Sequence, residues 1–221
     1  YDTLNELKGY AARVAASVGA MMCVLMRVRD PDVLARACDL GLAMQMTNIA
    51  RDVGEDARAG RLFLPLEWLA ALGVEPEQFL ARPSASPQIR ECTALLLREA
   101  AELYRRASPG VAGLPFDCRM AIYAAGHVYA AIGSEVRRQD YNSVTTRART
   151  TSAHKMRLMA LSALQAGIST VTPMSPRLHA RPDPEVAFLV AAASRRAVVS
   201  ARSEALLGIL QQLEARDRTS V

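Results

Sequence analysis

Four side chains that can offer oxygen ligands recur at helical spacing between residues 45 and 56. At about 100° per residue on a helix, they fall within about 80° of one another. This row consists of Gln45, Asn48, Asp52 and Asp56. Two carboxylates four residues apart repel each other on an isolated helix, so their charge needs compensation. A hard cation such as Mg²⁺, which binds carboxylates together with phosphate oxygens, would supply it.

The ordinary alternative for this segment is the acidic end of a solvated helix, screened by Arg51 and Arg58. Spacing alone slightly favours that alternative. The carboxamides of Gln45 and Asn48 count against it, because solvated helix faces prefer Lys and Glu. An apolar stripe lies next to the row and is expected to be buried. The stripe consists of Leu42, Met46, Ile49 and Val53.

The composition predicts that helices carry this row. Of the 221 residues, 51% are hydrophobic but only 5% are aromatic, and side chains such as Ala, Leu, Arg and Met favour helix over strand. No segment shows the alternating pattern of a strand. We therefore expect an all-α protein. The helices are predicted over residues 4–28, 32–56, 67–72, 89–107, 117–138, 152–165 and 185–216.

Pro, Gly and capping residues mark the breaks between these helices. Asp30 can cap the helix that carries the row, and Pro31 suits its first turn. A loop is predicted over residues 82–87, and four prolines between residues 173 and 184 mark a connector. We expect three regions: residues 1–172, the Pro-rich connector 173–184, and a C-terminal helix within 185–221.

The net charge of +5, with the histidines neutral, fits an anionic ligand or an anionic membrane surface. It fits a basic surface kept for solubility about as well. The basic residues do not gather into the stripe typical of a nucleic-acid-binding protein, so we expect no nucleic-acid partner. No apolar run is long enough to span a bilayer, and no signal peptide is visible. We predict a cytoplasmic protein.

The cysteines and histidines show no metal-ligand spacing. The four cysteines lie far apart without a Cys-x-x-Cys pair, which indicates free thiols in a reducing cytoplasm. The three histidines form no ligand pattern either. The chain begins with Tyr1 rather than Met and enters a helical pattern at once, so we expect that upstream sequence is missing.

Two neighbouring segments carry a family resemblance. Residues 45–56 read QMTNIARDVGED, and residues 60–67 read GRLFLPLE. Together they resemble the second aspartate-rich signature of the squalene and phytoene synthase family, which is roughly QxTNIxRDxxED followed by GRxxLP. The resemblance covers about residues 1–165. Its further points are VAASVG at residues 14–19, Tyr129, residues 140–142 and Arg147.

The resemblance implies an all-α, isoprenoid-synthase-type helical bundle that lacks its N-terminal helices. Family members carry two Asp-x-x-x-Asp motifs on facing helices, and this sequence shows one, at Asp52 and Asp56. The other is expected upstream of Tyr1, so residues 1–172 would form the C-terminal portion of the family's domain. Loss of the facing helices is expected to expose the apolar stripe and to cause aggregation or dependence on a partner.

The implied activity is head-to-head joining of two geranylgeranyl diphosphates to phytoene, through a cyclopropyl diphosphate, in carotenoid biosynthesis. Mg²⁺, with Mn²⁺ as the alternative, would bridge the aspartates and the diphosphate and neutralise the leaving group. Phytoene formation needs no reductant, and the sequence shows no Gly-rich dinucleotide motif. Peripheral contact with the inner membrane is a further expectation because the product is a lipid, although no amphipathic anchor stands out.

The resemblance also implies roles for single residues. Asp52 and Asp56 would be catalytic magnesium ligands, and Asn48 would be a third ligand that also contacts the substrate. Gln45 would lie near the diphosphate or near the allylic cation.

Five further residues receive roles by the same resemblance. Arg51 would face the diphosphate or pair with the glutamate four residues later. Tyr141 and Arg147 would lie near a diphosphate. Tyr10 and Tyr129 would line the substrate tunnel, although buried tyrosines more often belong to an ordinary helix core.

Hydrocarbon tails need a long apolar channel, and helices rich in Ala, Gly and Met can form one. The candidates for its lining are Met21, Met22, Met26, Met44 and Met46. Methionines at helical spacing more often belong to a plain core, which is the alternative for all five.

Three other interpretations are open. One is a squalene or dehydrosqualene synthase that uses farnesyl diphosphate. By the same resemblance, squalene synthases have Tyr at the position of Arg13, so Arg13 favours the carotenoid branch. Another is a non-catalytic assembly or scaffold relative, against which the retained Asp52 and Asp56 count. The third is an inactive fragment of the domain.

Overall fold

The computed structural model describes residues 1–171 and 175–195, and the regular structure in this part of the chain is entirely helical. A π-helical turn, Ala12–Ala16, joins α1 to α2, and 3₁₀ turns cover Ser108–Gly113, Pro176–His179 and Pro184–Val186. The predicted all-α class is confirmed. The α-helices are α1 (Leu4–Ala11), α2 (Ser17–Leu25), α3 (Pro31–Arg58), α4 (Leu66–Ala71), α5 (Pro76–Ala81), α6 (Pro87–Ala107), α7 (Phe116–Arg138), α8 (Ser152–Ile168) and α9 (Ala187–Ser194).

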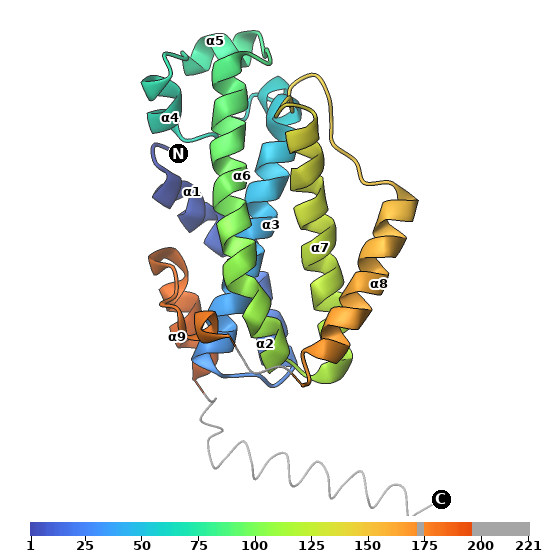
Figure 1. Ribbon diagram of the computed structural model, residues 1–221. Helices are drawn as coiled ribbons and strands as arrows, with labels where there is room; N and C mark the ends of the chain where they lie inside the picture. The colour runs from blue at the N-terminus through green and yellow to red at the C-terminus, as the bar shows by residue number, and fades with distance from the viewer. Residues whose placement is uncertain (172–174, 196–221) are drawn as a thin grey trace, which may run out of the picture.

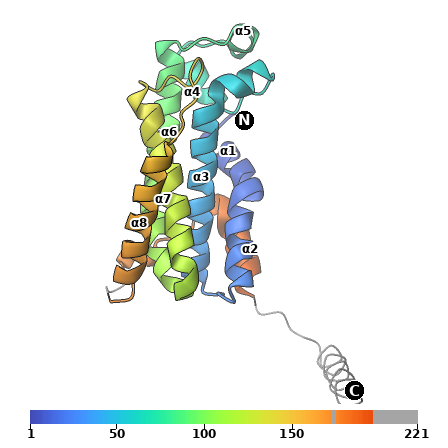
Figure 2. The same cartoon turned by 90° about the vertical axis from the view of Figure 1, so that its right-hand side faces the viewer.

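Helix α3 is the centre of the bundle (Figures 1 and 2) and packs against α2, α6, α7 and α9. Its apolar stripe lies inside the core: Leu42 and Met46 are fully buried, and Ile49 and Val53 are 4% and 5% exposed. The expectation that this stripe would be exposed is therefore wrong. The reason is that the stripe joins one core with buried side chains of α6 and of the segment after α3.

The start of α3 follows the capping signals in the sequence. Asp30 Oδ1 accepts hydrogen bonds from the backbone N–H groups of Asp32 at 2.8 Å and Val33 at 3.1 Å. Pro31 occupies the first turn, where its missing N–H costs nothing. Beyond the last turn, Gly60 adopts a φ of +70°, which ends the helix. The row therefore lies on a helix whose two ends are both defined locally.

The helix predicted over residues 4–28 is interrupted by the π-turn and ends at Leu25. Its α2 part approaches α3 very closely. A Cβ atom on Gly19 would meet the Ala37 carbonyl oxygen at 2.5 Å, and one on Gly41 would meet Ala16 Cα at 2.6 Å. Only glycine permits such an approach, so these two positions set the spacing between the helices.

Residues 60–67 fold back onto the start of the chain. The backbone N–H groups of Leu66 and Glu67 donate to the carbonyls of Tyr1 at 3.0 Å and Asp2 at 2.9 Å. Glu67 Oε1 also accepts from the N–H of Leu4 at 2.9 Å. The GRLFLPLE segment therefore connects the end of α3 to the start of α1.

Helix α5 was not predicted from the sequence. It has six residues, begins at Pro76 and is anchored by Phe79, which is 5% exposed. Such a short helix shows no periodicity that could have identified it. The longer helices predicted over 89–107, 117–138 and 152–165 are confirmed by α6, α7 and α8, whose bounds differ by a few residues at most.

The segment from residue 175 to residue 195 packs against the bundle. Arg36 Nη1 donates to the Arg177 carbonyl at 2.8 Å, and Lys8 Nζ lies 3.2 Å from Asp183 Oδ2. Of the helix predicted over 185–216, α9 covers an early part, and everything after residue 195 lies outside the described residues. The predicted division of the chain into three regions stays a prediction.

Buried ion pairs hold the first half of α3. Asp39 is completely buried, and Arg36 Nε lies 2.9 Å from its carboxylate. Arg106 of α6 adds two hydrogen bonds of 3.2 Å. Burial raises the pKa of Asp39, and the charges of the two arginines oppose this rise. Asp39 therefore offsets part of the charge of both arginines, and these contacts connect α3 to α6.

Apolar side chains remain exposed at two edges of the bundle. They include Val18 and Leu25 on α2, and Met156 and Leu164 on α8. In Figure 2 these two helices lie on opposite sides of α3, with α7 between α3 and α8. In the described ranges, no helix has both the length and the hydropathy needed to cross a membrane.

Candidate active site

The row predicted on α3 is present as a partly accessible polar strip. All four of its side chains are half-buried, beside the fully buried apolar stripe. The carboxamides of Gln45 and Asn48 make no hydrogen bond to any residue that the structure describes. Two amides and two carboxylates are therefore available along one helix face.

Two arginines hold Asp52. Arg51 donates from Nε to Oδ1 at 2.9 Å and from Nη2 to Oδ2 at 2.5 Å, and Arg147 Nε donates to Oδ1 at 2.9 Å. Burial by itself would raise the pKa of Asp52. The hydrogen bonds and charges of the two arginines outweigh burial and hold the pKa below its ordinary value. Asp52 is therefore ionised at neutral pH, as a metal ligand must be.

Arg51 does not pair with Glu55, which corrects one of its two expected roles. Its guanidinium reaches the adjacent Asp52 instead. Glu55 is contacted by Arg147, whose Nη1 lies 3.1 Å from Glu55 Oε2. Arg147 therefore bridges two carboxylates of α3 from a loop, although it is 95 residues away from Asp52 in the chain.

Asp56 is held by Arg61. Both Nε, at 3.0 Å, and Nη2, at 2.7 Å, donate to Asp56 Oδ1. Arg61 is the second residue of the GRLFLPLE segment, and its contact with Asp56 was not predicted. A basic residue one turn beyond an acidic helix end is the signal that could have identified it.

The loop after α7 is fastened to α3 at Gly54. The Gly54 N–H donates to the Ser143 carbonyl at 2.9 Å, and Arg58 Nη1 donates to the Val144 carbonyl at 3.0 Å. A Cβ atom at residue 54 would lie 2.3 Å from the Val144 oxygen, so only glycine fits here. The glycine of the VGED segment therefore allows the loop to bring Arg147 to the row.

Of the three tyrosines predicted near the substrate, Tyr10 lies apart from Tyr129 and Tyr141, which pack against one small cluster. Tyr10 stacks against Tyr1 and Phe63, with ring centroids 5.3 Å and 5.5 Å away. The small cluster is formed by Ile132 and Val136 of α7 and by Ala148 of the following loop. Tyr141 lies at the mouth of a cleft between α6 and α7, whose lining includes none of the four side chains of the row.

An apolar cavity of about 230 Å³ lies between α2, α3 and α7. Three of the five methionines predicted for a tunnel line it: Met22, Met26 and Met44. Met46 is fully buried in the core and Met21 is 56% exposed, so neither contributes to the lining. Met44 directly precedes the row on α3, so the polar strip and the apolar cavity are neighbours on the same helix.

The oxygen donors of the row match a hard divalent cation in kind. Asp52, Asp56 and Asn48 are the residues that would hold it. Among the described residues, no three side chains of His, Cys, Asp or Glu gather into a group. The row therefore supplies part of a coordination shell, and diphosphate oxygens or further ligands would have to supply the rest.

Comparison with known proteins relates the chain to one family over most of its length. The family model described as Squalene/phytoene synthase matches residues 1–157. Phytoene synthase of Rhodobacter capsulatus is 59% identical over 218 residues, which cover 99% of this chain and 64% of that protein. Phytoene synthase of Cereibacter sphaeroides is also 59% identical, with 99% and 61% covered. The chain therefore spans less than two thirds of the length of these two relatives.

Solved structures share the fold. A dehydrosqualene synthase in complex with ligand is 31% identical, with a TM-score of 0.68 over 76% of this chain and 59% of that one. YisP from Bacillus subtilis is 21% identical, with a TM-score of 0.64 over 72% of this chain and 64% of that one, and shows the fold alone. The helical bundle is thus of the isoprenoid-synthase type that the resemblance implied.

Proposed function

This chain belongs to the squalene/phytoene synthase family, and from this premise we propose that it is part of a phytoene synthase. The reaction would join two geranylgeranyl diphosphates head to head, through a cyclopropyl diphosphate, to give phytoene. The observation that supports this best is the juxtaposition on α3. Half-buried oxygen ligands lie directly beside an apolar cavity, as a diphosphate head and a hydrocarbon tail require.

We propose Mg²⁺, or else Mn²⁺, as the cofactor, held by Asp52, Asp56 and Asn48. When bound, such a cation would neutralise the charge that develops on the leaving diphosphate. The lowered pKa of Asp52 supports this role because the carboxylate is already ionised. Gln45 has no partner among the described residues and would donate its amide hydrogens to the diphosphate.

The arginines beside the row would serve the diphosphate in the same proposal. Arg51, Arg61 and Arg147 all lie within hydrogen-bond distance of a carboxylate of the row. Guanidinium groups bind phosphate oxygens in a bidentate manner. A small rotation of Arg147, which is 46% exposed, would bring it from Asp52 to a bound diphosphate.

The apolar cavity would hold part of a hydrocarbon tail. Met22, Met26 and Met44 line it with flexible, unbranched side chains that adapt to an isoprenoid. A dry cavity also protects an allylic cation from capture by water. Since the product would be a lipid, we propose a cytoplasmic protein that contacts the inner membrane peripherally.

A second candidate is a dehydrosqualene synthase that uses farnesyl diphosphate, favoured by the likeness to the solved dehydrosqualene synthase. A product assay separates the two. The full-length protein is incubated with radiolabelled geranylgeranyl or farnesyl diphosphate, with Mg²⁺ or with EDTA, and without a reductant. The proposal expects phytoene from the longer substrate with Mg²⁺ alone. A C30 product would favour the second candidate, and the absence of any product would favour a non-catalytic relative.

A further inference from the structure

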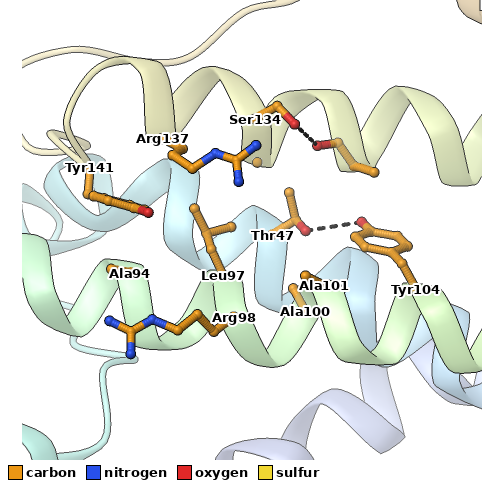
Figure 3. A pocket seen from close by; sticks show the side chains of 12 residues that line it. Thr47, Ala94, Leu97, Arg98, Ala100, Ala101, Tyr104, Ser134, Arg137 and Tyr141 are labelled. Atoms are coloured by element: carbon orange, nitrogen blue, oxygen red, sulfur yellow. Dashed lines mark hydrogen bonds between the residues drawn. The ribbon is translucent and has the colours of Figure 1, made fainter.

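A second cavity, of about 300 Å³, lies between α6 and α7 with Thr47 of α3 among its lining residues (Figure 3). Thr47 precedes Asp52 by five residues, so the two side chains point about 140° apart around the helix. The cleft and the carboxylate row are therefore on different faces of α3.

Small residues create this space between two long helices. Protein interiors are normally close-packed, so a gap of this size depends on which side chains face it. A Cβ atom on Gly133 would lie 3.2 Å from Leu97 Cδ2, so glycine leaves room there. The small residues of the lining are Ala94, Ala100, Ala101, Ala130 and Gly133.

The deep end of the cleft is polar but uncharged. The Thr47 hydroxyl donates to the Ala43 carbonyl at 2.9 Å, so in its 3.0 Å contact with Tyr104 the tyrosine is the donor. Burial raises the pKa of Tyr104, and the phenol therefore stays protonated. Its oxygen keeps lone pairs that a hydrogen-bond donor could use.

The mouth of the cleft is positively charged. The side chain of Arg137 makes no ion pair or hydrogen bond with any residue that the structure describes. In Figure 3 it extends from α7 into the space between the helices. Arg98 lies on the opposite wall, and its ion pair is to Glu91 at 2.7 Å. The lining contains no acidic side chain.

Tyr141 adds a hydroxyl at this mouth. Asp140 and Tyr141 adopt φ values of +51° and +55° directly after α7. Non-glycine residues in this conformation cost about 1 kcal/mol or more each and persist only where their surroundings fix them. Asp140 turns away to pair with Arg90, so its charge is held outside the cleft.

We propose that this cleft binds a compact amphipathic anion, namely a phosphate or diphosphate ester with a short, branched alkyl part. Arg137, Arg98 and the Tyr141 hydroxyl would bind the phosphate oxygens, because guanidinium groups and hydroxyls are strong donors to them. Leu97 and the alanines would cover the alkyl part. At about 300 Å³ the cleft is at the small end of ligand sites, which fits a short alkyl part.

Isothermal titration calorimetry of this chain with isopentenyl diphosphate tests the proposal. EDTA is present throughout, which removes binding through a divalent cation at the carboxylate row. We expect the cleft to bind inorganic diphosphate and isopentenyl alcohol more weakly than isopentenyl diphosphate. Arg137→Gln is expected to weaken binding by about tenfold or more. Ala101→Leu, at an exposed lining position of α6, is expected to abolish it by filling the cleft.

Two control variants locate the site, and circular dichroism checks that every variant is folded. Arg138→Gln and Arg105→Gln remove neighbouring charges that pair with Glu135 and Glu102 outside the cleft. Both should bind like the unmodified chain. The proposal is overturned by no binding at millimolar probe, by equal losses in the Arg137 and Arg138 variants, or by binding that survives Ala101→Leu. It is equally overturned if Arg105→Gln removes binding, or if inorganic diphosphate binds as tightly as the ester.

Discussion

Both carboxylates of the row on α3 accept hydrogen bonds from arginine side chains. Arg51 and Arg147 hold Asp52, and Arg61 holds Asp56. These contacts remove the repulsion that two carboxylates one turn apart would otherwise feel. The same guanidinium groups are suited to bind the diphosphate that the proposed reaction places here. The arginines would thus leave the carboxylates and bind the diphosphate when the substrate enters the site.

The ion pairs of Asp52 predict how stability depends on pH. The pKa of Asp52 is lower in the folded chain than in the unfolded chain. Asp52 therefore stabilises the fold above its unfolded pKa of about 3.9, and this contribution is lost as the pH falls through the folded pKa. We expect Asp52→Asn to reduce the free energy of unfolding by about 1 kcal/mol at about pH 7, and by progressively less below about pH 4. Urea titrations across this range measure the difference. A constant difference at every pH would contradict the lowered pKa.

Spacing in the sequence predicted the row but not its partners. Gln45, Asn48, Asp52 and Asp56 share a helix, so a period of 3.6 residues places them. Arg147 reaches Asp52 only because a loop 95 residues later in the chain is fastened to α3, which no local pattern reveals. The choice of Arg51 between its neighbour and Glu55 depends on side-chain rotamers, which spacing does not determine.

At the scale of elements, the contact between the loop after α7 and Gly54 joins two parts of the site. We expect Gly54→Ala to reduce the free energy of unfolding by about 1–3 kcal/mol, because its Cβ would lie 2.3 Å from the Val144 oxygen. The same variant should displace Arg147 from Asp52. Thermal melts and urea titrations check the stability.

Gly167→Ala is the matched control for that variant. Gly167 lies in α8, and a Cβ atom at this position would have no neighbouring atom within 4 Å. Alanine there should therefore be neutral or stabilise the chain by up to about 1 kcal/mol. Equal behaviour of the two alanine variants would mean that the loop does not depend on the close approach at Gly54.

Elements with strong local signals were predictable and the others were not. Asp30 and Pro31 mark the start of α3, and long periodic segments mark α6 and α7. The short helix α5 and the π-turn have no such signal. Helix α5 is anchored by Phe79, and the π-turn packs closely against Gly41 of α3. The α6–α7 cleft combines side chains of three helices, so it appears only in the folded chain.

At the scale of the whole molecule, apolar side chains at the two edges predict self-association. Val18 on α2 is 49% exposed and Leu164 on α8 is 61% exposed. Contiguous exposed apolar surface promotes association. We expect this chain to sediment as a concentration-dependent mixture and to bind a hydrophobic dye.

Serine at both positions tests that expectation. The double variant Val18→Ser, Leu164→Ser should shift the sedimentation profile toward monomer and reduce dye fluorescence, while leaving the fold intact because both side chains are exposed. A chain that is fully monomeric before the substitutions, with no dye bound, would show that these edges do not associate.

The central claim is that the carboxylate row of α3 carries out the ionisation of an allylic diphosphate. The most direct measurement is the Mg²⁺-dependent turnover of geranylgeranyl diphosphate by the full-length protein carrying Asp52→Asn. The control is Asp32→Asn, in the first turn of the same helix. We predict that Asp52→Asn lowers turnover by about 100-fold or more, because it removes a carboxylate ligand of the proposed Mg²⁺. Its circular dichroism spectrum should be unchanged. Asp32→Asn should remain near the unmodified rate. Similar turnover in both variants would contradict the account and remove Asp52 from the chemistry.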